Sequence, residues 1–139
     1  MARVDFYVLS QSGEQARQLF ACRLAEKAYK LKHSVHIEAG SPDVAERLDD
    51  LLWTFRDGSF VPHHVVGKAE LDSPVTIGCG NDVGARDLLI NLSDDIPSIA
   101  ASFSRIAELV SSDDDVRRRG RQRFATYRDG GHEIETHNV

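Results

Sequence analysis

The chain has 139 residues, of which 41% are hydrophobic and 28% are charged, and its formal net charge is −5. These values are ordinary for a soluble globular protein, and the length predicts a single domain over residues 1–139. Two distant cysteines, Cys22 and Cys79, indicate neither a disulfide framework nor a zinc site. Because no apolar stretch is long enough for a membrane span or a signal peptide, we expect a cytoplasmic protein without membrane contact.

The first half of the chain predicts alternating strands and helices. The apolar run at residues 4–9 is typical of a strand, and residues 14–32 carry apolar side chains at helical spacing. Residues 34–38 predict a second strand. Ser41-Pro42 predicts the start of a second helix, because serine caps helices and proline suits the first helical position. Parallel neighbours need a crossover helix, so this order predicts an α/β domain with a mostly parallel central sheet flanked by helices.

The second half predicts further strands after an irregular stretch. Residues 56–73 show no clear period, although they keep several large apolar side chains. Residues 75–77 and 87–92 predict strands, and the second is apolar enough to be buried on both faces of a sheet. Residues 103–110 could form a helix, but we interpret them as a strand. The expected fold is therefore a single Rossmann-like domain that ends in a basic helix.

The basic helix is the last predicted element, and it carries a cluster of arginines. It spans residues 113–129, with aspartates at its start, arginines to its end and Gly130-Gly131 as its stop. Residues 116–128 carry a charge of +6, which leaves −11 for the rest of the chain. One stripe of this helix, at 100° per residue, contains Arg117, Arg121, Phe124 and Arg128. This stripe could be a solvated basic face, or it could bind the carboxylates of an acidic peptide.

Two motifs that would indicate an enzyme fail a structural test. The glycine-rich segment at residues 78–84 resembles a phosphate-binding loop, but such a loop needs a following helix. The next apolar run begins at Asp87 and leaves no room for that helix. The candidate metal or catalytic side chains lack convergent spacing, since adjacent residues on an extended segment point apart. They are His36, His63, His64 and Cys79. We therefore expect no catalytic site, no cofactor and no metal.

The only tryptophan and the loop that follows it form a second group of interest. Trp53 lies near the end of the predicted second helix, and Phe60, Val61, Pro62 and His63 follow it in the irregular stretch. These side chains could plug the local core. They could also bind a protein partner, because aromatic and proline residues on loops are common interface anchors.

Three segments of the chain resemble the chi subunit family of bacterial DNA polymerase III. They are residues 48–67 (LDDLLWTFRDGSFVPHHVVG), 87–93 (DLLINLS) and 121–137 (RQRFATYRDGGHEIETH). The first and third motifs are specific, and the resemblance extends in order along essentially the whole chain. It implies a Rossmann-like fold without a nucleotide site, in agreement with the rejected glycine loop.

The resemblance also implies a function and two sets of binding residues. The protein would be a non-catalytic adaptor that binds the acidic C-terminal tail of single-stranded DNA-binding protein (SSB) and pairs with the psi subunit of the clamp loader complex. The tail-binding residues would be Arg117, Arg121, Phe124 and Arg128. The psi-binding residues would be Trp53, Phe60, Val61, Pro62 and His63.

The chain departs from the family in the tail-binding stripe. Well-known members carry a tyrosine at the position of Phe124 and a lysine at that of Ala125. Arg118, Arg119 or Arg123 could supply the missing charge. The main alternative function is direct binding of single-stranded nucleic acid by the arginine helix. A stripe with a single aromatic residue offers little base stacking, which disfavours this alternative.

Overall fold

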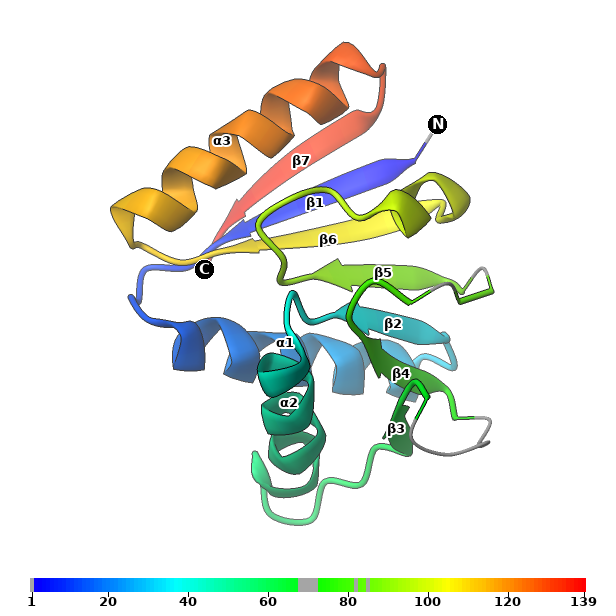
Figure 1. Cartoon of the computed structure of the whole chain (residues 1–139). Coiled ribbons are helices and arrows are strands. Elements are labelled where there is room, and N and C mark those ends of the chain that lie inside the picture. Colours follow the sequence, from blue (N-terminus) through cyan, green and yellow to red (C-terminus); the bar gives the residue numbers. More distant parts are fainter. Residues whose placement is uncertain (1, 68–72, 82, 85) are drawn as a thin grey trace.

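A single parallel sheet organises the structure. The computed structural model describes residues 2–67, 73–81, 83–84 and 86–139, and within them one sheet contains seven strands flanked by three α-helices (Figure 1). The strands are β1 (Arg3–Val8), β2 (Val35–Glu38), β3 (His63–Val65), β4 (Val75–Gly78), β5 (Leu88–Asn91), β6 (Arg105–Val110) and β7 (Glu133–Asn138). The helices are α1 (Glu14–Lys30), α2 (Pro42–Thr54) and α3 (Asp114–Asp129), with a short 3-10 helix, η1, at Ser98–Ser102.

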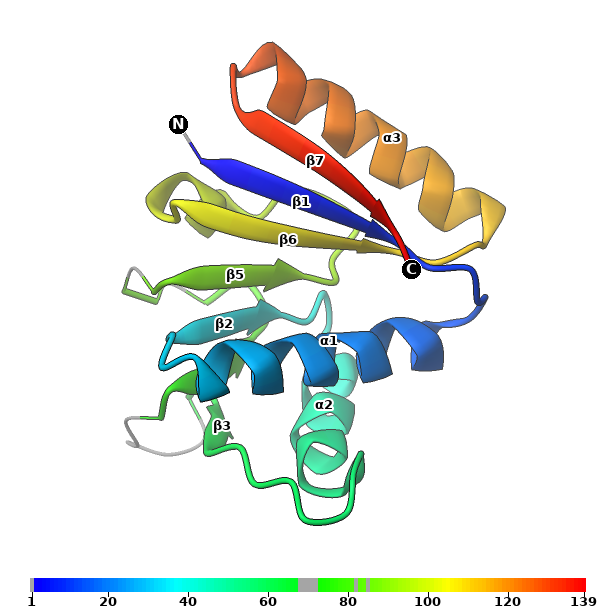
Figure 2. The ribbon, with the colours of Figure 1, turned by 180° about the vertical axis from the view of Figure 1, so that it is seen from behind.

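The strand order is β3-β4-β2-β5-β6-β1-β7, and every pairing is parallel. This confirms the predicted α/β fold with a parallel central sheet. The helices α1 and α2 pack on one face of the sheet, whereas α3 and η1 pack on the other (Figures 1 and 2). On β5, Leu88 and Ile90 face the first layer and Leu89 faces the second, so this strand is buried on both faces as predicted.

Most of the predicted elements are confirmed, and two strands were missed. Ser41 caps α2 as expected, because its hydroxyl accepts a hydrogen bond from the Val44 amide at 3.2 Å. The ambiguous stretch at residues 103–110 contains a strand, β6. The irregular stretch contains β3, whose three residues are too few to show a period; residues 68–72 of that stretch lie outside the described residues.

The prediction that the basic helix is the last element is wrong, because β7 follows it. The helix α3 does end at the predicted glycines, and Gly131 adopts a left-handed conformation with φ of 81°. The chain then turns back and pairs with β1 as an edge strand of the sheet. The β7 sequence, EIETHN, is largely polar because this edge strand is mostly exposed.

A buried carboxylate anchors α3 to the sheet. Glu108 on β6 is fully buried, and this burial raises the pKa of its carboxyl. The charge of Arg123 and the hydrogen bonds donated to the carboxylate lower the pKa, but the effect of burial is larger. Arg123 Nε donates to Oε1 at 2.9 Å, and the Tyr127 hydroxyl donates to Oε2 at 2.7 Å. Asn91 on β5 donates to both carboxylate oxygens at 3.0 and 3.2 Å. The guanidinium of Arg123 also donates to the backbone carbonyl of Asp94 at 2.7 Å, so its charge is spread over two partners.

We expect Arg123→Ala to lower the free energy of unfolding by ~3–5 kcal/mol, because it leaves the buried Glu108 carboxylate without its counter-charge. Arg118→Ala is the matched control. Arg118 is exposed on the same helix, and its one ion pair among the described residues is with Asp115, so we expect a change within ~0.5 kcal/mol. Urea denaturation of both variants measures the difference. Equal losses would contradict an anchoring role for the Glu108–Arg123 pair.

Candidate functional site

A groove of about 310 Å³ lies between α3 and the neighbouring strands β1, β6 and β7. One wall comes from α3 and contains three of the four residues predicted to bind the tail: Arg117, Arg121 and Phe124. The floor is apolar, with Phe6, Val8 and Val110 from the sheet. Phe124 is half-buried and its ring packs against Phe6, with centroids 5.3 Å apart. The groove therefore combines an apolar base with a cationic wall.

The opposite wall of the groove comes from β7, the strand that the sequence did not reveal. Thr136 and Asn138 line it from this strand, which lies alongside α3 (Figure 1). Gly120 of α3 also lines the groove, and a Cβ atom built on it would lie 3.0 Å from Val110 Cγ2. A side chain at position 120 would therefore be crowded against β6. The glycine lets the helix approach the sheet closely and leaves the groove open between the two arginines.

The two arginines of the groove are free to bind a ligand. Within the described part of the chain, neither Arg117 nor Arg121 has an ion-pair or hydrogen-bond partner for its guanidinium, and both are exposed. Each guanidinium can therefore make a bidentate contact with a carboxylate without first breaking an internal interaction.

The other arginines of α3 are engaged elsewhere. Arg128 does not line the groove, and its guanidinium lies 3.6 Å from the carboxylate of Asp129. Arg119 pairs with Asp94 at 2.5 Å, and Arg118 pairs with Asp115 at 3.2 Å. Arg123 is buried against Glu108 on the sheet side of the helix. Arg119 and Arg123 are therefore already engaged in ion pairs and are poorly placed to supply a free charge beside Phe124.

Trp53 and Phe60 form an exposed aromatic patch, here called the Trp53 patch, at the edge of the sheet opposite the groove. Their side chains are 50% and 64% exposed, and their ring centroids lie 5.7 Å apart. The alternative that these two rings plug the core is therefore wrong. The patch lies beside α2 and β3, whereas the groove lies beside α3 and β7, at the opposite edge of the sheet (Figure 1).

The remaining residues of the predicted psi-binding set lie beneath the patch. Val61 is completely buried in the core, and Pro62 is half-buried. His63 is buried, and its ring centroid lies 4.5 Å from that of Trp53, with the two planes tilted by 50°. Both ring nitrogens of His63 lie within hydrogen-bond distance of backbone carbonyls, those of Val61 at 2.6 Å and Asp49 at 2.9 Å. These residues hold the loop and the tryptophan in place rather than offering surface themselves.

The motifs rejected as catalytic keep structural roles in the fold. In the glycine loop, the Gly80 amide donates to Glu38 at 2.9 Å and the Cys79 amide donates to Asn81 at 3.0 Å, so these donors are already used. No helix follows among the described residues of this segment; Asp82 lies outside them. His36 is buried, with Nδ1 2.8 Å from the Thr76 hydroxyl.

Among the described residues, the candidate metal or catalytic side chains do not come together in a site. The candidates His36, His63, His64 and Cys79 form no three-ligand group within the described ranges. Burial raises the pKa of the Cys22 thiol to about 12, which leaves it protonated and unreactive at neutral pH. None of the helices in the described part of the chain combines the length and the apolar character that a membrane crossing requires.

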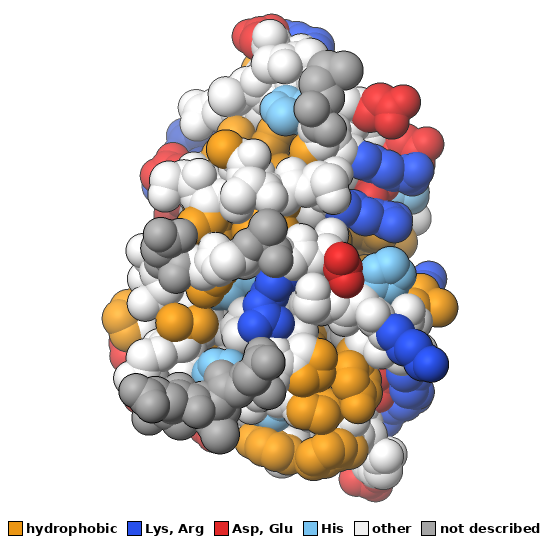
Figure 3. All heavy atoms as spheres, turned by 90° about the vertical axis from the view of Figure 1, so that its right-hand side faces the viewer, with side chains coloured by type: hydrophobic (Ala, Val, Ile, Leu, Met, Phe, Trp, Pro, Cys, Tyr) orange, Lys and Arg blue, Asp and Glu red, His pale blue; other side chains and the backbone are white. Residues whose placement is uncertain are grey.

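Charges of both signs alternate on the face at which the strands begin. Figure 3 views this face and shows Lys and Arg side chains beside Asp and Glu, with hydrophobic side chains gathered in its lower part. The charged residues at the starts of the strands include Arg3 and Arg105, which both lie near the Asp5 carboxylate. The described residues of this face therefore form no continuous basic track of the kind that a phosphate backbone would require.

Solved structures with low sequence identity share this fold. The chain superposes on the crystal structure of T4 UvsW with a TM-score of 0.70 at 9% identity, covering 99% of this chain and 41% of that one. It superposes on Saccharomyces cerevisiae Dbp5 with a TM-score of 0.64 at 14% identity, covering 97% of this chain and 41% of that one. The chain spans less than half the length of both structures, and at these identities the likeness shows the fold alone.

Relatives with higher sequence identity match over nearly their whole length. The chain is 39% identical to the DNA polymerase III subunit chi of Pseudomonas aeruginosa, covering 100% of this chain and 98% of the relative. It is 32% identical to the subunit chi of Haemophilus influenzae, covering 97% and 96%, and 28% identical to that of Escherichia coli, covering 98% and 97%. Residues 1–135 match the family described as "DNA polymerase III chi subunit, HolC", and the chain therefore belongs to the chi subunit family of DNA polymerase III, an accessory component of that enzyme.

Proposed function

We propose that the protein is a non-catalytic adaptor that binds the acidic C-terminal tail of SSB in the α3 groove and pairs with the psi subunit through the Trp53 patch. One observation carries the first half of this proposal. The guanidiniums of Arg117 and Arg121, which have no partner among the described residues, lie beside an apolar-floored groove in a chain whose net charge is −5. An acidic peptide that ends in an apolar residue matches both features.

The tail would bind with its charge and its apolar end in different parts of the groove. Its carboxylates would pair with Arg117 and Arg121, where bidentate contacts give both affinity and direction. Its terminal aromatic side chain would pack on Phe124 and the floor around Val110, inside the volume of about 310 Å³. Arg128 would contribute a weaker contact from outside the groove, after leaving Asp129.

The psi contact is supported by the exposure of the Trp53 patch. Large aromatic side chains exposed side by side are typical of interface anchors, because they bury much apolar area with few rotatable bonds. The patch is separated from the groove by the width of the sheet, so the two partners would bind at the same time without contact between them (Figure 1).

We expect Arg121→Ala to weaken binding of a labelled SSB-tail peptide by ~1–3 kcal/mol, because it removes one charge-assisted contact in the groove. Arg118→Ala is the matched control. It removes the same charge from the same helix, but from a side chain that does not line the groove. Fluorescence anisotropy titrations at one salt concentration compare the two variants.

Equal weakening by the two variants would show that a diffuse field, and not the groove, attracts the peptide. Added salt should weaken the wild-type contact, since both guanidiniums are exposed and therefore screened.

We expect Trp53→Ala or Phe60→Ala to abolish co-purification with psi, because interface anchors of this kind cost ~2–4 kcal/mol on truncation. Both variants should keep tail-peptide affinity and the wild-type melting temperature, since both side chains are at least half exposed. Leu31→Ala is the control, because Leu31 is a 63%-exposed side chain at the end of α1. A normally folded Trp53 variant that still co-purifies with psi would contradict the proposed interface.

A further inference from the structure

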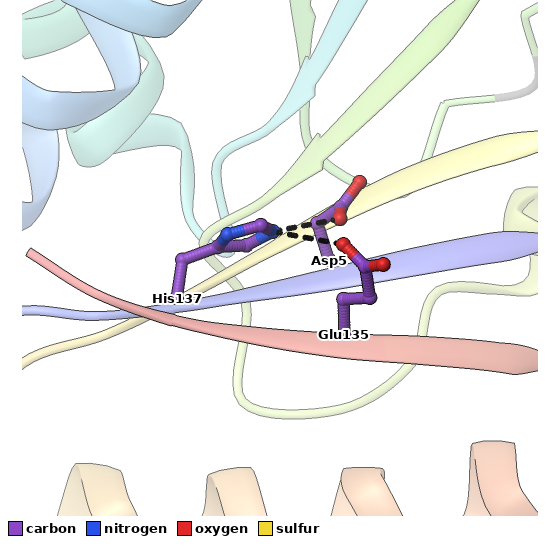
Figure 4. Close-up of side chains that lie close together, drawn as sticks. All are labelled: Asp5, Glu135 and His137. Carbon is purple, nitrogen blue, oxygen red and sulfur yellow. Dashed lines mark hydrogen bonds and ion pairs between the residues drawn. The ribbon is translucent and has the colours of Figure 1, made fainter.

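Three side chains from the paired strands β1 and β7 converge on the sheet face opposite the groove. The register places Asp5 beside Glu135 and Tyr7 beside His137, so alternate residues of both strands share this face. Figure 4 shows the carboxylates of Asp5 and Glu135 pointing toward the His137 ring. His137 Nε2 lies 2.9 Å from Asp5 Oδ1 and 3.9 Å from Glu135 Oε2.

Two of the three side chains are already held in place. Asp5 is 2% exposed, and the His137 ring stacks on Tyr7 with centroids 4.9 Å apart and an angle of 19° between the planes. Asp5 and Tyr7 also line a separate cavity of about 110 Å³ between the sheet and α1. Little ordering is therefore needed to bring a buried carboxylate and an imidazole together, and the adjoining cavity leaves room for a water molecule.

We propose that Asp5, Glu135 and His137 form a binding site for one Zn²⁺ ion. The three ligand atoms lie within 4.8 Å of one another. Bonds of about 2.1 Å in a tetrahedral site place ligand atoms about 3.4 Å apart, between the observed distances from His137 Nε2 to the two carboxylates. One imidazole and two carboxylates suit zinc better than Mg²⁺ or Ca²⁺, which prefer oxygen ligands alone. Water from the adjoining cavity completes the fourth position.

Two arginines currently balance the charge of these carboxylates, and zinc must compete with them. Arg3 contacts Glu135 at 2.9 Å and Asp5 at 3.4 Å, and Arg105 lies 3.6 Å from the second Asp5 oxygen. Both arginine side chains are about half exposed, at 45% and 53%, so either can turn into solvent. The Arg3 bridge occupies the same oxygens as the ion, and its displacement is the main cost of metal binding.

Zinc at this site would pin the edge strand β7 to β1. Thr136 and Asn138, which alternate with Glu135 and His137 along β7, line the groove on the other face. The site therefore clamps the strand whose opposite face forms a groove wall, and a bound ion should raise the melting temperature of the full chain by mass action.

The test is a zinc titration of the untagged, full-length protein against a chromophoric chelator, with Co²⁺ absorption as an independent readout of nitrogen ligation. We expect one equivalent to bind, and we expect His137→Ala and Glu135→Gln each to weaken binding by about tenfold or more. His33→Ala is the matched control. His33 is half exposed, and its one ion-pair partner among the described residues is Asp87 at 3.8 Å. It lines the adjoining cavity but lies outside the three-ligand group, so its loss should leave zinc affinity unchanged.

Arg3→Ala is the most discriminating variant. A metal site predicts tighter zinc binding without Arg3, whereas a simple salt-bridge cluster does not. Removal of the competing guanidinium should tighten zinc binding about two- to fivefold, the size of one exposed ion pair, and should increase the thermal shift caused by zinc. The proposal is overturned if the wild-type protein binds no zinc, if His33→Ala and His137→Ala weaken binding equally, or if Arg3→Ala weakens it. Thermal melting without zinc checks that each variant is folded.

Discussion

A helix with six arginines can pack on a sheet only if the arginine that faces the sheet finds a buried counter-charge. Glu108 supplies that charge to Arg123, and Tyr127 and Asn91 saturate the rest of the carboxylate. The contact fixes the rotation of α3 about its own axis. Because Arg117 and Arg121 lie on another side of the same helix, this rotation decides that they face the groove and not the acidic segment around Asp94. Without the Glu108–Arg123 contact, α3 would lose the interaction that fixes this orientation.

The same sheet separates two surfaces of different chemistry. The β7 edge carries a cationic groove with an apolar floor, and the β3 edge carries exposed rings held by the buried His63. Charged contacts in water are weakened by salt, whereas burial of aromatic area is not. If the protein is the adaptor proposed above, it would hold one partner through a salt-sensitive contact and the other through a salt-tolerant one. The parallel topology gives a rigid spacer between them, because all seven strands belong to one hydrogen-bonded sheet.

The order of strands and helices could be predicted because each is long enough to show a period or a cap, as with Ser41 before α2. The strands β3 and β7 could not be predicted from the sequence. The strand β3 has three residues, and β7 is a polar edge strand whose Ile134 alone packs against the core. Helical angles placed Arg117, Arg121 and Phe124 on one side correctly, but they could not show that the groove stops before Arg128. The meeting of Asp5 with His137 depends on strand register across most of the chain, which no local pattern contains.

The proposed function requires the α3 groove to recognise an acidic peptide and not the nucleic acid to which SSB binds. The most direct measurement compares a labelled SSB-tail peptide with a labelled single-stranded oligonucleotide of equal net charge, titrated with the same protein at the same salt concentration. A groove with one half-buried aromatic ring and two guanidiniums offers a peptide both charge and an apolar base, but it offers an oligonucleotide only phosphate contacts. We expect the peptide to bind much more tightly, and equal or tighter binding of the oligonucleotide would rule out tail recognition by the groove.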